Sequence, residues 1–160
     1  KKLRQDHMPK HHPPESHHAE PSHSYVLTFN NISSLDSAIE ENSFIAVLFY
    51  APWCGHSRRL APHWTDASVV FHNSDFGIVL GKVDMTKPAN AELRTRYGIR
   101  GFPTLKVFKA HSELPYEFRG ALDVDGIVNY LKIERSRCKD CKDTQGVDHV
   151  IDAFAKEHGF

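Results

Sequence analysis

One cysteine lies in a short motif whose residue types could do thiol chemistry. The segment APWCGHS, residues 51–57, places a tryptophan before Cys54 and a glycine and a histidine after it. In a redox-active Cys-x-x-Cys centre a second cysteine would stand three residues after the first, but this chain has Ser57 there. A cysteine thiolate attacks disulfides and forms a mixed disulfide with its target. The motif therefore predicts a nucleophilic Cys54 without a resolving sulfur at the usual spacing.

The elements expected around Cys54 favour its thiolate form. Residues 44–50 (FIAVLFY) form an apolar run of strand length, and after Trp53 apolar residues recur at helical spacing, at Leu60, Trp64, Ala67 and Val70. Cys54 then stands at the start of a helix, where unpaired N–H groups and the helix dipole stabilise a thiolate. A protonated His56 would add to this effect, and Pro52 and Trp53 would form an apolar lip. The alternative is a buried, inert thiol.

A second pair of cysteines, Cys138 and Cys141, has true C-x-x-C spacing but a different setting. No apolar strand or Trp-containing lip precedes it. It could be a small structural disulfide, a zinc half-site, or a pair that releases Cys54 mixed disulfides from a flexible tail. Flanking arginines and lysines would lower the pKa of these thiols and suit the last role. With three cysteines in the chain, at least one thiol is unpaired or pairs outside it.

Composition does not favour two classes of partner, nucleic acid and membranes. The 160 residues include 20 Lys and Arg and 20 Asp and Glu, so no net charge favours nucleic acid or an anionic membrane. The longest apolar run is about ten residues, well short of the ~20 needed to cross a bilayer. We therefore expect a globular domain with no nucleic-acid or membrane contact. Since the chain begins Lys-Lys, we expect it to be processed or a piece of something longer.

The chain divides into three parts. Residues 1–24 are rich in His, Pro and Ser, and we expect a disordered leader whose histidines could chelate a metal. Residues 25–134 carry the pattern β-α-β-α-β-α-β-β-α, which predicts an α/β domain with helices on both faces of a mixed sheet. Asp123 is the expected cap of the last of these helices. Residues 135–160 form an extension with the C-x-x-C pair and a short helix. Asn31 begins an Asn-x-Ser sequence and is a glycosylation candidate.

Two motifs in the central part resemble a known family. The segments FYAPWCGH (49–56) and YGIRGFPTLKVF (97–108) resemble the a-type, thioredoxin-fold domain of the protein disulfide isomerase family. The resemblance implies a thioredoxin fold, the lumen of the endoplasmic reticulum, protein substrates and thiol–disulfide exchange. It implies no cofactor and no bound metal. Such a domain could be a whole lumenal protein or the lumenal or extracellular part of a larger one.

The resemblance also assigns roles to residues. The catalytic centre would consist of Cys54, His56 and Ser57. A cis-proline loop would face the cysteine and let an extended client pair with its backbone like an added strand. The residues expected to contact a client are Pro52, Trp53, Gly55, Phe102 and Pro103.

Two further positions indicate whether Ser57 is a native residue or a laboratory replacement. Family members with both cysteines usually carry a buried acid six residues before the first cysteine, and here that residue is Leu48. They commonly have an arginine two residues after the glycine that follows the fifth strand, and here, aligned on Gly120, it is Leu122. All three groups would activate a resolving sulfur, and all are absent together. This favours a native Ser57 over a laboratory replacement.

We therefore expect protein disulfide isomerase-like exchange through Cys54 alone. Such a domain would form mixed disulfides, show only weak net oxidoreductase activity, and retain or chaperone its clients. The expected partners are cysteine-containing unfolded or partly folded proteins, with glutathione or a partner oxidoreductase. Two alternatives are a dithiol isomerase domain with its resolving cysteine replaced, and a module that binds clients noncovalently.

Overall fold

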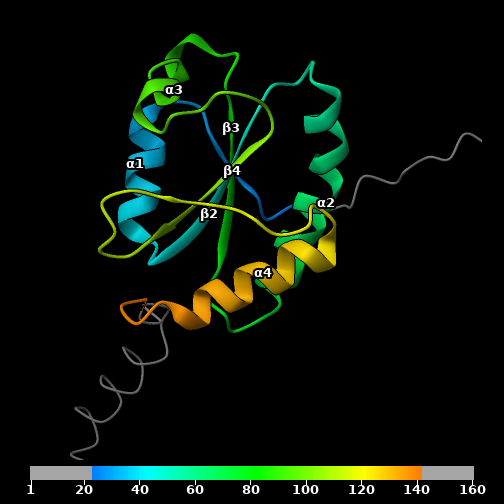
Figure 1. The fold of residues 1–160 in the computed structure, drawn as a ribbon, viewed down its shortest axis with the longest axis vertical. Coiled ribbons are helices and arrows are strands. Elements are labelled where there is room, and N and C mark those ends of the chain that lie inside the picture. Colours follow the sequence, from blue (N-terminus) through cyan, green and yellow to red (C-terminus); the bar gives the residue numbers. More distant parts are fainter. Residues whose placement is uncertain (1–22, 142–160) are drawn as a thin grey trace, which may run out of the picture.

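The computed structural model describes residues 23–141, which fold around one five-stranded sheet of order β1-β3-β2-β4-β5 (Figure 1). The strands are β1 (Leu27–Phe29), β2 (Phe44–Tyr50), β3 (Val79–Asp84), β4 (Thr104–Lys109) and β5 (Tyr116–Glu117). The helices are α1 (Ile32–Glu41), α2 (Gly55–His72), the 3-10 turn η1 (Pro88–Asn90), α3 (Leu93–Arg96) and α4 (Val124–Arg137). Of the predicted leader, residues 1–24, all but the last two lie outside the described part, as does the predicted C-terminal helix.

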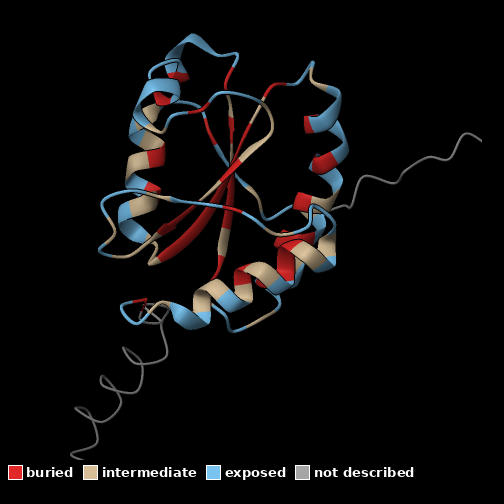
Figure 2. Ribbon diagram, in the orientation of Figure 1, coloured by how far each residue is buried: buried red, intermediate tan, exposed pale blue. Residues whose placement is uncertain are grey.

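Strand β2 is the central strand of the sheet, and helices cover both faces of the sheet around it. It pairs in parallel with β3 and antiparallel with β4. Its side chains alternate, with Leu48 in the core cluster beside α2 and α4, and Phe49 in the cluster beside α1 and α3. Figure 2 shows the strands and the inner helix faces as buried. The predicted mixed sheet with helices on both faces is confirmed.

Side-chain caps fix where two of the helices begin. The Asn31 side-chain oxygen accepts a hydrogen bond from the Ser34 N–H at 2.8 Å and starts α1. The Asp123 carboxylate accepts from the Gly126 N–H at 2.7 Å and starts α4, the predicted cap. Helix α4 then runs to Arg137, past residue 134, where we expected the domain to end.

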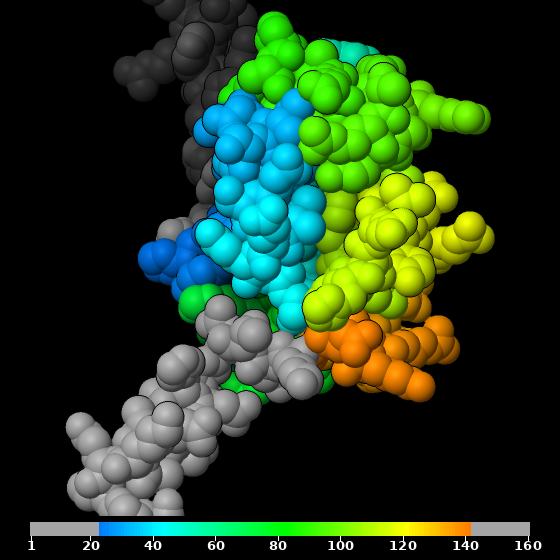
Figure 3. Space-filling model, turned by 90° about the vertical axis from the view of Figure 1, so that its left-hand side faces the viewer, coloured from blue at the N-terminus to red at the C-terminus, as the bar shows by residue number. Residues whose placement is uncertain are grey.

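An ion pair joins α1 to α3 on one face of the sheet. Figure 3 shows α1, in blue to cyan, beside the green segment that contains α3. Arg96 of α3 donates to both carboxylate oxygens of Asp36 on α1, at 2.9 and 3.1 Å. Glu92 lies 3.8 Å from the same guanidinium. Among the described residues, no helix is long and apolar enough to cross a membrane.

Candidate active site

Cys54 occupies the junction between the central strand and α2. It is the N-cap of α2, with φ −80° and ψ 122°. Its N–H donates to the Ala51 carbonyl at 3.0 Å, and its own carbonyl accepts from the Arg58 N–H at 3.0 Å. The thiol is free and half-buried. The sulfur therefore stands at the positive end of an 18-residue helix while remaining within reach of solvent.

The loop before β4 faces this sulfur. The Phe102-Pro103 peptide is cis, and the Cys54 thiol donates to the Phe102 carbonyl oxygen across 3.6 Å. Sheet pairing brings the loop there, because Phe49 near the end of β2 pairs with Thr104 at the start of β4. The structure thus brings together the two motifs that resemble the family, which lie about fifty residues apart in the sequence.

The helix start lowers the pKa of the Cys54 thiol below its ordinary value. The main cause is the Ser57 backbone N–H, and the His56 N–H acts in the same direction, whereas partial burial opposes both. The Ser57 hydroxyl adds to the shift, although its Oγ makes no regular hydrogen bond in the described part of the chain. The backbone N–H of Ser57 is therefore the dominant cause of the lowered pKa. The positive charge of Arg59 lowers the pKa further.

Arg59 supplies a cation beside the site that the motif did not predict. A guanidinium nitrogen of Arg59 lies 2.8 Å from Nδ1 of His56. A guanidinium can only donate, so Nδ1 is the acceptor in this contact. The motif spacing did not identify Arg59, because its role comes from a side-chain contact.

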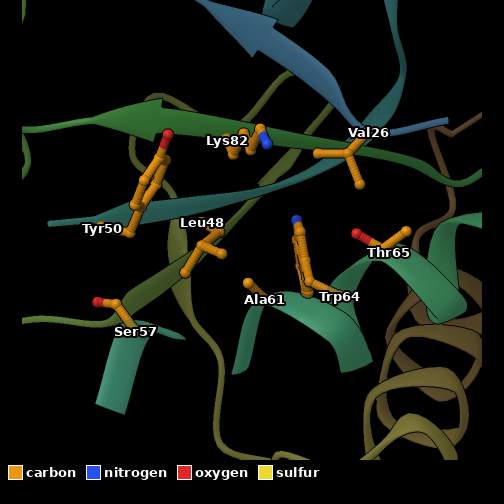
Figure 4. A pocket seen from close by; sticks show the side chains of 8 residues that line it. All are labelled: Val26, Leu48, Tyr50, Ser57, Ala61, Trp64, Thr65 and Lys82. Atoms are coloured by element: carbon orange, nitrogen blue, oxygen red, sulfur yellow. The ribbon is translucent and has the colours of Figure 1, made fainter. Parts of the chain in front are cut away.

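Ser57 is buried where a second sulfur would stand. Its side chain is 2% exposed, and its Oγ has no hydrogen-bond partner among the described residues. It lines a cavity of about 50 Å³ that also touches Leu48, Trp64 and Lys82 (Figure 4). A water molecule needs about 10–15 Å³ on this measure, so the cavity has room for a few.

At position 48, where the family resemblance led us to look for a buried acid, this cavity is lined by a leucine. Leu48 on β2 is buried and is the register partner of Lys82 on β3. Figure 4 shows both side chains at the cavity, which Trp64 of α2 also lines. No carboxylate of the described residues forms an ion pair with Lys82. Leu122 lies half-exposed in the loop between β5 and α4.

An exposed aromatic lip stands beside the sulfur. Trp53 is 71% exposed, and its ring meets the Phe102 ring edge-on, with centroids 6.2 Å apart. Pro52 and Gly55 are also exposed, so three of the five expected contact residues are exposed beside Cys54. The other two, Phe102 and Pro103, are half-buried.

A second arginine contacts this lip. The Arg94 guanidinium lies 5.4 Å from the centroid of the Phe102 ring. Our reading of the sequence did not identify Arg94. The available signal was charge, since residues 93–104 contain three arginines and no Asp or Glu.

The C-x-x-C pair is a disulfide at the other end of the sheet. Cys138 and Cys141 are bonded, with their Cα atoms 5.4 Å apart. The Cys141 sulfur is 3.0 Å from the carbonyl oxygen of Ser43, which precedes β2, whereas Cys54 follows β2. Seven strand residues at ~3.3 Å each separate these ends by roughly 20 Å. Because Cys141 is only 5% exposed, a flexible tail that reaches Cys54 does not fit this arrangement.

The remaining candidates are the glycosylation acceptor and the possible metal ligands. Asn31 is exposed at the start of α1. In the described part of the chain, no three His, Cys, Asp or Glu side chains are grouped as metal ligands. The histidines of the leader lie outside that part, apart from His23.

Comparison with known sequences gives a consistent set of relatives. The thioredoxin family model matches residues 26–133. A protein disulfide-isomerase of Datisca glomerata is 41% identical over 111 residues, which is 69% of this chain and 22% of the relative. That of Zea mays is 44% identical over 107 residues, 67% of this chain and 21% of the relative. The chain thus spans about a fifth of the length of these relatives.

Comparison with solved structures agrees. The crystal structure of human ERp44, form I, superposes with a TM-score of 0.60 at 27% identity, over 70% of this chain and 30% of that one. The first thioredoxin domain of mouse protein disulfide-isomerase A4 superposes with a TM-score of 0.60 at 24% identity, over 69% and 75%. The second likeness shows the fold alone.

Proposed function

Because this chain belongs to the thioredoxin family, we propose that it exchanges disulfides with protein clients through one nucleophile, Cys54. Its fold is the thioredoxin fold, and protein disulfide isomerases are among its relatives. The proposed clients are cysteine-containing, unfolded or partly folded proteins. The proposed compartment is the lumen of the endoplasmic reticulum, where disulfides form and persist.

One observation carries this proposal. The free, half-buried Cys54 sulfur stands at a helix start, with a lowered pKa, beside the Phe102 carbonyl. These are the features of a reactive cysteine rather than of a buried structural thiol. Ser57 fills the place of a second sulfur, so the proposed chemistry ends at the mixed disulfide.

The step balances without an added oxidant. The Cys54 thiolate attacks one sulfur of a client disulfide, a new S–S bond forms, and the client's own S–S bond breaks. The second client sulfur leaves as a thiolate and takes a proton from water. One disulfide replaces another, so nothing is oxidised or reduced overall.

The serine determines what happens next. A resolving cysteine would attack the mixed disulfide and release the client, but a hydroxyl at Ser57 cannot take that role. Release then needs a thiol from the client, glutathione or a partner oxidoreductase. The domain would hold clients covalently and have little net oxidoreductase activity of its own, as expected of a retention or chaperone protein.

The test is adduct formation by the full chain. It is incubated with oxidised glutathione at pH 7 under native conditions, and the intact mass and peptide map are recorded. We expect one glutathionyl group, on Cys54, and none in the Cys54→Ser variant. An unreactive Cys54 would overturn the proposal.

Such a negative result would favour noncovalent client binding, which the 71% exposure of Trp53 also favours. In that case Cys54→Ser would bind an unfolded, cysteine-free client as tightly as the unmodified chain. Covalent capture instead predicts that binding of a cystine-containing client depends on Cys54.

A further inference from the structure

The two segments that meet at Cys54 are rich in arginine and contain no acids. Residues 51–65 build the start of α2, and residues 93–104 build α3 and the facing loop. Together they contain five arginines and no Asp or Glu, in a chain whose formal net charge is zero. Positive charge is therefore concentrated on these two segments, although Glu92 borders the second of them and lies 3.8 Å from Arg96.

Two of these arginines are connected to the site from opposite sides. Arg59 of α2 contacts His56 at 2.8 Å, and its charge acts on the Cys54 sulfur. Arg94 of α3 lies 5.4 Å from the Phe102 ring, and the Phe102 carbonyl is 3.6 Å from that sulfur. One cation thus stands on the helix side of the thiol and one on the loop side.

Neither of these two charges is neutralised by a carboxylate of the described residues. Arg96 is the arginine of this group that is paired, with Asp36 and Glu92. Neither Arg59 nor Arg94 has a carboxylate within 4.0 Å in residues 23–141. Both residues are exposed, and a guanidinium stacked on a ring still has N–H groups for a carboxylate.

We propose that Arg59 and Arg94 make Cys54 selective for disulfides flanked by carboxylates, so that its preferred clients are acidic, cystine-containing peptide segments. This inference rests on the proposed function, because it concerns which disulfides the Cys54 thiolate attacks. The reaction is the same exchange: one S–S bond forms to Cys54, one client S–S bond breaks, and the leaving thiolate takes a proton from water. Acidic residues on both sides of the attacked cysteine would lie near both cations.

Electrostatics of this kind acts mainly on the encounter rate. Opposite charges around a site raise association rates by ~10- to 1000-fold in strong cases, and salt reduces the effect. Two exposed arginines are a modest case. We expect roughly a five- to tenfold preference for the acidic peptide at low salt, falling towards twofold above the physiological range, where the Debye length is below ~8 Å.

The experiment uses the full chain and three peptide disulfides that differ only in the residues flanking cysteine, which are Glu, Gln or Lys. Mixed-disulfide formation with Cys54 is followed by stopped flow and mass spectrometry at two salt concentrations. Because flanking charge also changes the intrinsic reactivity of a peptide disulfide, each rate is divided by that of the same peptide with a small neutral thiol. The readout is the Glu-to-Lys ratio of these normalised rates.

Variants assign the preference to the two cations. Arg59→Gln and Arg94→Gln should each lower the ratio two- to threefold, and the double variant should bring it near one. Arg94→Lys should keep most of it. The matched control is Arg137→Gln, at the end of α4, whose partner Glu134 contacts Lys109 at the opposite end of the sheet. A ratio cancels any change in Cys54 thiolate content, which Arg59→Gln will also cause.

The outcomes separate this inference from the proposal on which it rests, disulfide exchange through Cys54. Adducts that form at equal normalised rates with all three peptides would overturn the selectivity and leave the exchange proposal standing. A preference that survives in the double variant, or that Arg137→Gln also removes, would overturn the assignment to Arg59 and Arg94. If no peptide forms an adduct with Cys54, both proposals fail.

Discussion

Leu48 and Lys82 face each other across β2 and β3, and both line the cavity that reaches Ser57. The lysine has no carboxylate partner in the described part of the chain, and the leucine occupies the place of the expected acid. An acid at position 48 would be able to take a proton from a sulfur at position 57. The present chain has neither an acid at position 48 nor a thiol at position 57, so no proton passes between these two positions.

Restoring both groups should create the missing step. Ser57→Cys alone should form an internal disulfide with Cys54 but reduce insulin slowly, because no base serves the buried thiol. Adding Leu48→Glu should raise that rate by roughly 100-fold at pH 7, at the low end of general acid–base effects. The control is Leu48→Gln with Ser57→Cys, which has the size but cannot take a proton. Insulin reduction by Ser57→Cys alone at the rate of the double variant would contradict the idea.

The carboxyl should also cost stability. Leu48 is buried in the main core cluster, so Leu48→Glu places a polar group in largely apolar surroundings. We expect the free energy of unfolding in urea to fall by about 1–3 kcal/mol at pH 7. Lys82 should limit the loss, and Leu48→Glu combined with Lys82→Met should be less stable than Leu48→Glu alone. Equal stability of these two variants would show that the lysine does not reach the acid.

The lowered pKa of Cys54 predicts a pH profile with a known sign. The rate of alkylation by iodoacetamide should rise with pH through a midpoint below that of an ordinary thiol, because the thiolate is the nucleophile. Arg59→Gln should move the midpoint to higher pH and slow alkylation at pH 7 by roughly two- to threefold. Arg58→Gln is the matched control, since Arg58 is not among the causes of the shift. An equal effect of both substitutions would argue against a specific role for Arg59.

The same shift links Cys54 to stability. The folded chain holds the thiolate more readily than the unfolded chain, so the folded pKa is below the unfolded one. The stabilising contribution is present above the unfolded pKa and is lost as pH falls through the folded pKa. The stability of the unmodified chain relative to Cys54→Ser should therefore rise between neutral and alkaline pH.

Much of the fold could be predicted from the sequence because it depends on patterns along one segment. The apolar run of β2 predicted a strand covered on both faces, and Asp123 predicted the start of α4. Periodicity was less reliable at the end of α2. Its spacing predicted a buried Val70, but Val70 is 39% exposed and Phe71 packs in the core instead. One residue of helical rotation, about 100°, separates these outcomes.

The parts of the site that sequence could not predict arise from contacts between distant or flexible side chains. The Arg59–His56 contact depends on two rotamers, and the Arg94–Phe102 contact depends on how α3 packs beside the loop. The burial of Cys141 against Ser43 joins residues 98 positions apart. No spacing rule encodes such pairs, whereas the Cys54–Phe102 juxtaposition followed from a family resemblance.

The Cys138–Cys141 disulfide should stabilise the domain without taking part in exchange. Closing so short a loop is worth about 2 kcal/mol in the chain-entropy treatment, and burial of Cys141 adds packing. Cys138→Ser with Cys141→Ser should therefore lower the free energy of unfolding by about 2 kcal/mol. Release of a Cys54-linked peptide by glutathione should be unchanged. Slower release in the double variant would restore a resolving role for this pair.

The Asn31 cap gives a prediction that separates folding from glycosylation. Asn31→Ala removes the acceptor for the Ser34 N–H and should cost about 1 kcal/mol of stability. Asn31→Asp keeps the cap and removes the glycosylation acceptor. If a glycan is attached in a secretory host, Asn31→Asp should lose its mass with little change in stability. A cost as large as that of Asn31→Ala would show that the cap does not act through this side-chain oxygen.

The exposed Trp53 ring should contribute to client capture but not to thiol reactivity. It meets the Phe102 ring edge-on beside the sulfur and has a large accessible apolar surface, which would be buried by a client with an aromatic or aliphatic residue next to its cysteine. We expect Trp53→Ala to slow mixed-disulfide formation with such a peptide by roughly tenfold, from the loss of 1–2 kcal/mol of apolar contact. Oxidised glutathione, which has no large apolar side chain, should react at nearly the unmodified rate. An exposed aromatic away from the site, Tyr116→Ala on β5, is the matched control. Equal slowing with glutathione and with the apolar peptide would mean that Trp53 acts on the Cys54 thiolate itself, and the lip would then not be a client-binding surface.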